Sequence, residues 1–182
     1  MELQAKRIVV FGLQGSGKTN YIKHLLAQVP NHLVYDVLHE YKGYNRYIPE
    51  DRSSVQELEL ATRLVTKPPY KIKLFALDEA NRYCPPKPSP LPKAILDLND
   101  FNRHFGVTFL IAARRPTQLH SDLVELAHYR VFFSLHGKND LLYLDQLKDG
   151  LSETVLNLAP YEYAVLDERG KIKVYPPCPL MN

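Results

Sequence analysis

The sequence predicts a single α/β domain over residues 1–182, with a mainly parallel central sheet flanked by helices. Short apolar runs alternate with longer stretches of helical spacing, the pattern of parallel strands joined by crossover helices. The first run, Arg7–Phe11, is apolar on both faces, as a central buried strand requires. The length of 182 residues, with 45% hydrophobic and 24% charged, fits one globular domain and excludes disordered, collagen-like and coiled-coil chains.

The first half of the chain begins with this strand and a glycine-rich turn. Tyr21, Ile22, Leu25 and Leu26 then fall at helical spacing, and Ser53 or Ser54 is placed to cap a later helix. In order, the predicted elements are a strand at 7–11, a helix at 18–28, a strand at 32–37, a polar loop at 38–54, a helix at 55–65 and a strand at 71–77.

The second half opens with five prolines between positions 85 and 92, which forbid a regular helix and predict a stiff surface loop. The elements predicted after it are helices at 93–104, 121–127 and 140–148, strands at 107–113 and 129–135, and a C-terminal β-hairpin with strands at 161–167 and 171–175. The proline-rich tail from Pro176 is expected to cap the fold or to fray.

Several classes of protein are excluded by what the sequence lacks. No stretch approaches the ~20 apolar residues that cross a bilayer, so no integral membrane segment is expected. Cys84 and Cys178 are isolated, which argues against a zinc site or a disulfide framework. The formal charge of +3 permits a polyanionic partner without requiring one. We therefore expect a cytoplasmic protein.

The strongest motif lies between the first strand and the first helix, where Gly12–Thr19 (GLQGSGKT) matches G-x-x-x-x-G-K-[ST] in full. Backbone N–H groups of such a loop, together with the helix N-terminus, bind the phosphates of ATP. Lys18 would reach the β- and γ-phosphates, and the Thr19 hydroxyl would bind Mg²⁺. The residues expected to hold the nucleotide are Gly12, Gln14, Gly15, Ser16, Gly17, Lys18, Thr19 and Asn20.

A second motif is the apolar run Lys73–Leu77, which ends in the adjacent acids Asp78 and Glu79. Asp78 would hold Mg²⁺ through its water shell, and Glu79 would activate the attacking water. An acid available to accept the proton of water favours hydrolysis of ATP over phosphate transfer to a small molecule.

With these motifs, the chain resembles the HerA–FtsK superfamily of ring-forming, DNA-pumping ATPases, above all its short viral genome-packaging members. Two more segments carry the likeness: Val34–Tyr41, similar to the family's "Asp, three residues, Glu-Tyr" segment, and Asn102–Pro116, similar to a strand preceded by Arg and Gly and closed by Arg-Pro. The resemblance implies a P-loop NTPase fold of the ASCE (RecA-like) type.

The resemblance also implies roles for two arginines. Arg103 aligns with an arginine that reaches into a neighbouring subunit's site, although a solvated helix end is the plain alternative. The family commonly has Thr-Gln before its Arg-Pro, whereas this chain has Ala113-Arg114. Arg114 either replaces the glutamine as a cationic γ-phosphate sensor or leaves that role to another residue. Arg115, on the opposite face of the strand, is left for packing or an interface.

The tyrosines at positions 41, 44 and 47 recur beside Lys42 and Arg46. Aromatic residues interleaved with cations can stack on bases, but such a run is more often a packed loop.

The function that these features predict is an ATP-hydrolysing motor that translocates double-stranded DNA as a homo-oligomeric ring, packaging a viral genome with a capsid or vertex protein. Met1 lies a few residues before the first strand, so we expect a complete, short chain of the packaging type, cytoplasmic or associated with the virion. Two alternatives stay open: a nucleotide-dependent assembly or switch ATPase without DNA pumping, and a small-molecule P-loop kinase.

Overall fold

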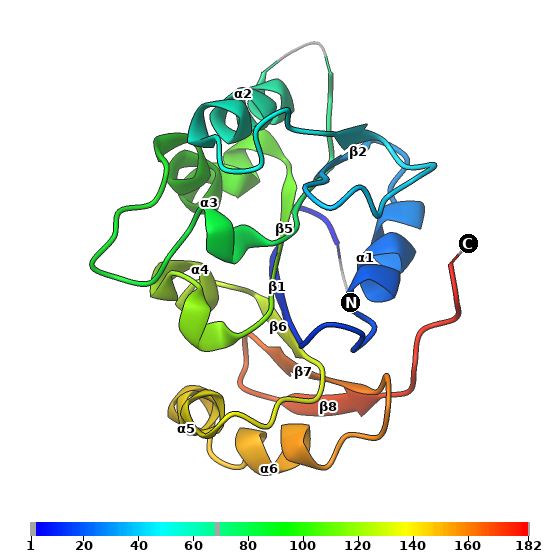
Figure 1. Ribbon diagram of the computed structural model, residues 1–182, viewed down its shortest axis with the longest axis vertical. Coiled ribbons are helices and arrows are strands. Elements are labelled where there is room, and N and C mark those ends of the chain that lie inside the picture. The colour runs from blue at the N-terminus through cyan, green and yellow to red at the C-terminus, as the bar shows by residue number, and fades with distance from the viewer. Residues whose placement is uncertain (1–2, 68–69, 182) are drawn as a thin grey trace.

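A computed structural model describes residues 3–67 and 70–181, which form one eight-stranded sheet with helices on both faces (Figure 1). The strands are β1 (Arg7–Phe11), β2 (His32–Tyr35), β3 (Arg46–Tyr47), β4 (Leu74–Leu77), β5 (Thr108–Ala113), β6 (Tyr129–Phe132), β7 (Tyr163–Asp167) and β8 (Ile172–Tyr175). The helices are α1 (Lys18–Ala27), α2 (Val55–Thr66), α3 (Lys93–Phe105), α4 (Ser121–Glu125), α5 (Lys138–Leu147) and α6 (Leu151–Leu156), with short 3₁₀ turns at Ala80–Arg82 and Pro116–Gln118.

The sheet has the strand order β3-β2-β4-β5-β1-β6-β7-β8. The pairs from β3 through β6 are parallel, whereas β6–β7 and β7–β8 are antiparallel and form the C-terminal hairpin. The predicted fold class is therefore confirmed. The central position of β1 places the phosphate loop that follows it near the middle of one edge of the sheet.

The central strands β1, β4 and β5 bury both faces, so the core is divided into two layers. In β1, Ile8 and Val10 pack on one side against α1, and Val9 and Phe11 pack on the other side in the layer that contains the apolar residues of α2 to α6. Figure 1 shows α1 on the opposite side of the sheet from α2, α3 and α4. Side chains that alternate along a strand explain why one apolar run serves both layers.

Several boundaries differ from the predicted ones for local reasons. The strand predicted at 71–77 begins at Leu74, because Lys71 has a φ of +48°, which is incompatible with extended backbone. The strand predicted at 32–37 ends at Tyr35, where the carboxylate of Asp36 turns the chain. The short strand β3 inside the predicted loop and the helix α6 were not predicted. Along the described ranges, no helix has the length and apolar character needed to cross a membrane.

Candidate active site

The phosphate loop joins the end of β1 to the first turn of α1, as the motif predicts. Gly15 and Gly17 have φ values of +77° and +104°, in the left-handed region that favours glycine. A Cβ at Gly12 would lie 2.5 Å from Ser16 Oγ, so this position also excludes a larger residue. The N–H groups at the start of α1 have no partner within the helix, which makes this end an anion site.

A pocket of about 440 Å³ opens at the loop and draws on four further segments of the chain. It contains every predicted site residue except Gly12, which packs beneath the loop, and Arg103. Its lining residues are Leu13, Gln14, Gly15, Ser16, Gly17, Lys18, Thr19, Asn20, Leu38, Glu40, Asp78, Glu79, Arg114 and Tyr161.

The acidic pair Asp78 and Glu79 follows β4 directly, and both side chains are buried. Tyr41 donates its hydroxyl to Asp78 Oδ2 at 2.8 Å, and the Glu79 N–H donates to Asp78 Oδ1 at 2.8 Å. Burial raises the pKa of the Asp78 carboxyl, while these two hydrogen bonds oppose the rise. Glu79 has a φ of +51°, a strained value for a non-glycine residue of the kind found at functional sites.

The segment Asp36–Tyr41 is part of the site rather than a surface turn. Asp36 is fully buried, accepts the N–H groups of Glu40 and Tyr41 at 2.9 and 3.1 Å, and pairs with Arg46 at 2.9 Å. Held in this way, Glu40 Oε2 accepts the Thr19 hydroxyl at 2.9 Å. Glu40 and Tyr41 belong to the segment that resembles the family, but the sequence analysis does not predict them as site residues; their spacing after Asp36 is the signal that could have identified them.

The tyrosine run beside this segment is a packed loop, as its more common interpretation predicts. Tyr41 is fully buried, and the ring of Tyr47 stacks on Tyr35 with centroids 5.5 Å apart. The ring of Tyr44 lies against His32 with centroids 5.7 Å apart. These three rings therefore serve the fold, and the alternative of base stacking is not supported.

Two cations face the acidic pair. Lys18 lines the pocket, where burial lowers the pKa of its ammonium group and the carboxylates of Asp78 and Glu79 oppose the change. Arg114 follows β5 and donates from Nε to Glu79 Oε1 at 3.3 Å. Because its side chain is 44% exposed and lines the pocket, Arg114 is also accessible to a bound phosphate.

The neighbouring Arg115 points elsewhere. Its Nε donates to Asp140 Oδ2 at 2.6 Å, and Thr117 donates its hydroxyl to Asp140 Oδ1 at 2.7 Å. Asp140 is buried on α5, so Arg115 and Thr117 neutralise and satisfy a carboxylate that would be costly alone. The two arginines thus have different surroundings, as their alternation predicts.

We expect Arg114→Ala to lower ATP turnover by about 10²–10³-fold, the usual cost of removing a donor to the reacting group. Arg115→Ala should instead lower the free energy of unfolding by about 1–3 kcal/mol, because Asp140 keeps its burial and loses a partner. Steady-state turnover and urea unfolding of both variants separate these effects. A large loss of turnover at Arg115 in folded protein, with little change at Arg114, would reverse the assignment.

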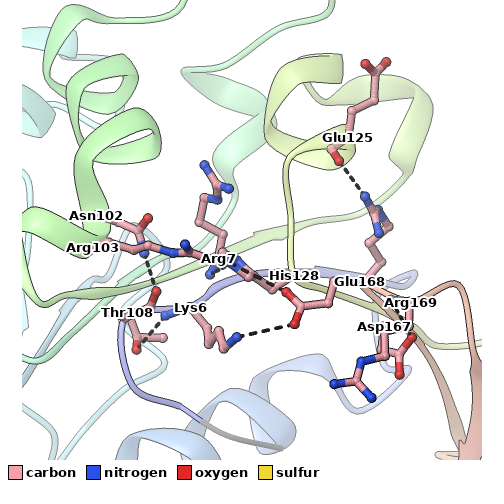
Figure 2. Close-up of polar contacts among 12 residues, drawn as sticks. Lys6, Arg7, Asn102, Arg103, Thr108, Glu125, His128, Asp167, Glu168 and Arg169 are labelled. Atoms are coloured by element: carbon pink, nitrogen blue, oxygen red, sulfur yellow. Dashed lines mark hydrogen bonds and ion pairs between the residues drawn. The ribbon is translucent and has the colours of Figure 1, made fainter.

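Arg103 lies near the N-terminal end of β1, beside Arg7 and His128 (Figure 2). It lies in the last turn of α3 and extends toward Arg7 at the start of β1, with its Nη2 3.1 Å from His128 Nε2, whereas the phosphate loop follows the far end of β1. The structure therefore does not bring Arg103 to the pocket of its own chain.

The pocket suits Mg²⁺ bound together with a nucleotide. The Thr19 hydroxyl and the Glu40 and Asp78 carboxylates are oxygen donors at one site, the ligand type that Mg²⁺ prefers. Within residues 3–67 and 70–181, no group of three or more His, Cys, Asp or Glu side chains could hold a metal unaided.

No protein-family model and no curated protein match the sequence. Solved structures do match the fold. The genome packaging NTPase B204 of Sulfolobus turreted icosahedral virus 2, in complex with sulfate, gives a TM-score of 0.83 at 21% identity, covering 100% of both chains. Its complex with ATP-gammaS gives 0.81 at 21% identity, covering 96% of this chain and 98% of that one.

A more distant match is the N-terminal domain of zonular occludens toxin from Neisseria meningitidis, with a TM-score of 0.60 at 13% identity over 95% of each chain. Both matched proteins are similar to this chain over nearly its whole length. The likeness to the packaging NTPase agrees with the resemblance noted in the sequence. The chain therefore has the P-loop NTPase fold, in the form found in the B204 genome packaging NTPase.

Proposed function

We propose that the protein is an ATP-hydrolysing motor that translocates double-stranded DNA and packages a viral genome. The observation that carries the proposal is the pocket itself, in which a complete phosphate loop faces two carboxylates and the long, positively charged side chain of Arg114. The fold that holds this pocket is shared with a packaging NTPase. ATP-gammaS is present in the B204 complex, which supports a nucleoside triphosphate as the ligand of this pocket.

The arrangement assigns a role to each group. The loop N–H groups and Lys18 would hold the phosphates, and Thr19, with Asp78 through water, would hold Mg²⁺, whose charge screens the phosphate oxygens. Glu79 would accept the proton of the attacking water. The ion pair of Arg114 with Glu79 gives Arg114 an alternative partner to the γ-phosphate, so arrival of the phosphate would release Glu79 for its role as base.

The finer parts of the proposal are the DNA substrate, a homo-oligomeric ring, a capsid or vertex protein as partner, and a place in the host cytoplasm or on the virion. They are supported by the likeness to B204 over the full length of both chains. Phosphate-backbone contacts suffice for such a motor, since a packaging enzyme has no need to read bases.

The test is ATP turnover by purified protein with and without long double-stranded DNA. We expect hydrolysis that DNA stimulates several-fold and that weakens as salt is raised, because phosphate contacts release counterions. Turnover unaffected by DNA at any salt concentration contradicts the motor and leaves an ATPase of another kind.

A second candidate is an assembly or switch ATPase, because the phosphate pocket by itself supports nucleotide binding without requiring a DNA substrate. It would hydrolyse ATP without a response to DNA. A small-molecule kinase is less well supported, because Glu79 is an acid available to accept the proton of water. Phosphate transfer to an added acceptor would identify it.

A further inference from the structure

The carboxylate of Asp78 has two fixed hydrogen-bond donors, one on each oxygen. The Tyr41 hydroxyl donates to Oδ2 and the Glu79 N–H donates to Oδ1, each at 2.8 Å. An ionised carboxylate offers about four acceptor positions, so each oxygen keeps one for the water shell of a metal ion. Donors on both oxygens also set the plane of the carboxylate. The side chain is therefore held in one orientation and can still accept further hydrogen bonds.

The two donors come from different parts of the chain. The Glu79 N–H belongs to the next residue, whereas Tyr41 lies 37 positions before Asp78, in the loop that follows β2. Strand β2 pairs with β4, which brings this loop to the end of β4, where Asp78 lies. Tyr41 is fully buried, and its own N–H donates to Asp36 Oδ2 at 3.1 Å. Tyr41 is thus anchored at both its backbone and its hydroxyl.

The Tyr41 hydroxyl is a permanent donor. Burial and the neighbouring Asp78 carboxylate raise the pKa of this hydroxyl well above its ordinary value. It therefore keeps its proton and directs it at Asp78, so Tyr41 acts as a donor to the carboxylate rather than as a metal ligand. Packing of the loop needs only the aromatic ring, which phenylalanine also supplies. The hydroxyl is the part of Tyr41 that the site uses.

The residue before Tyr41 contacts the other expected metal ligand. Glu40 Oε2 accepts the Thr19 hydroxyl at 2.9 Å, and the Glu40 N–H donates to Asp36 Oδ1 at 2.9 Å. Thr19 lies on α1 and Asp78 follows β4, so the two expected ligands come from separate elements. Two adjacent side chains, both anchored on the buried Asp36, thus reach one ligand each. Packing of the loop alone does not require this arrangement.

We propose that Tyr41 is a positioning residue for Mg²⁺, because its hydroxyl orients the Asp78 carboxylate that would hold the water shell of the ion. The inference rests on the proposed nucleotide-binding function and adds a residue to it. A buried charge needs hydrogen-bond partners, and Tyr41 supplies one to the buried Asp78. Replacing a residue that hydrogen-bonds a metal ligand commonly weakens metal binding about 10- to 100-fold. Tyr41 should therefore affect binding of the ion, and binding of the nucleotide only through the ion.

The experiment measures binding of ATP-gammaS, a slowly hydrolysed analogue, by calorimetry over a series of Mg²⁺ concentrations and with Mg²⁺ removed by EDTA. Tyr41→Phe keeps the ring and removes the hydroxyl. Tyr47→Phe is the matched control, since this tyrosine belongs to the same run and its hydroxyl donates at 3.3 Å to Glu57, which is outside the pocket. Tyr41→Phe is also made in Asp78→Ala protein, which has lost the carboxylate. Urea unfolding checks that each variant is folded.

In Tyr41→Phe protein, the Mg²⁺ concentration that gives half of the tightening of ATP-gammaS binding should rise at least about 10-fold. The affinity measured without Mg²⁺ should stay unchanged, and Tyr47→Phe should change neither value. In Asp78→Ala protein, Tyr41→Phe should add no further effect on the Mg²⁺ requirement, because a residue that acts through a second one is not additive with its loss.

An unchanged Mg²⁺ requirement in folded Tyr41→Phe protein overturns the proposal. An equal loss of affinity with and without Mg²⁺ also overturns it, since the change would then be one of loop packing. A similar effect in Tyr47→Phe, or a full additional effect in Asp78→Ala protein, does the same. The proposed function fails separately, if the unchanged protein does not bind ATP-gammaS at any Mg²⁺ concentration.

Discussion

Glu79→Gln protein will bind ATP with unchanged affinity and hydrolyse it about 10²–10⁴-fold more slowly, the usual contribution of a general base. The amide has the size of the carboxylate and can still accept the hydrogen bond from Arg114, which is 3.3 Å long here, so the pocket should keep its shape. What it cannot do is take a proton from water. Binding by calorimetry and turnover by phosphate release measure the two effects separately.

The structure supplies a sharp control for this prediction, because Glu40 is a second carboxylate in the same pocket. Its oxygen is 2.9 Å from the Thr19 hydroxyl, which places it beside the Mg²⁺ position rather than beside Arg114. Glu40→Gln should therefore alter the dependence of turnover on Mg²⁺ concentration more than the maximal rate. Wild-type turnover in Glu79→Gln, with a collapse in Glu40→Gln, would transfer the role of base to Glu40.

A further control distinguishes loss of chemistry from loss of binding. Lys18→Ala removes the positive charge from the phosphate loop, so both ATP affinity and turnover should fall. If Glu79→Gln behaved like Lys18→Ala in the calorimeter, its effect would be on binding, and the assignment of Glu79 as base would be wrong.

The parts of the site that the sequence predicts are those in which the motif and its elements are adjacent along the chain. The phosphate loop follows an apolar strand, and Asp78 and Glu79 follow another, so an apolar run and the residues just after it suffice to place both. In a parallel sheet, the C-terminal ends of the strands meet at one edge, which brings the loop and the acids together.

The parts that the sequence does not predict are contacts between distant segments. The Thr19–Glu40 and Tyr41–Asp78 hydrogen bonds join residues 21 and 37 positions apart, and the Asn20–Cys178 bond joins residues 158 positions apart. No local pattern encodes such pairs, because they depend on strand order and on how a loop returns to the sheet. The same holds for an apolar pocket lined by Tyr21, Phe133 and Pro177, whose walls come from distant parts of the chain.

The structure narrows the role predicted for Arg103 more than that of any other predicted site residue. At the N-terminal edge of the sheet it cannot reach its own phosphate loop, so a catalytic role requires a neighbouring subunit. Its local contacts leave the positive charge of its guanidinium group without a carboxylate partner among the described residues. The Arg7 N–H donates to His128 Nδ1 at 3.0 Å, and burial lowers the pKa of His128 to about 4, so at neutral pH the imidazole is uncharged and carries its proton on Nε2.

That nitrogen lies 3.1 Å from Arg103 Nη2, so the group nearest to the guanidinium here is an uncharged imidazole. In the part of the chain that the structure describes, no carboxylate lies within ion-pair distance of Arg103 either. The helix end thus presents an exposed cation that has no carboxylate partner among the described residues; a solvated helix end is the plain alternative. An arginine supplied in trans to a P-loop site is worth about 10³–10⁵ in rate.

We therefore predict that Arg103→Ala lowers turnover by at least about 10³-fold while leaving ATP affinity unchanged. The decisive experiment mixes this variant with Glu79→Gln protein. Each alone lacks one half of every site, whereas a mixed assembly contains some interfaces where an intact Glu79 faces an intact Arg103. Activity should reappear on mixing and rise with total protein concentration, because the complete site exists only between subunits. Mixed assemblies that form and stay inactive, or an Arg103→Ala protein with normal turnover, would instead make Arg103 a solvated helix end.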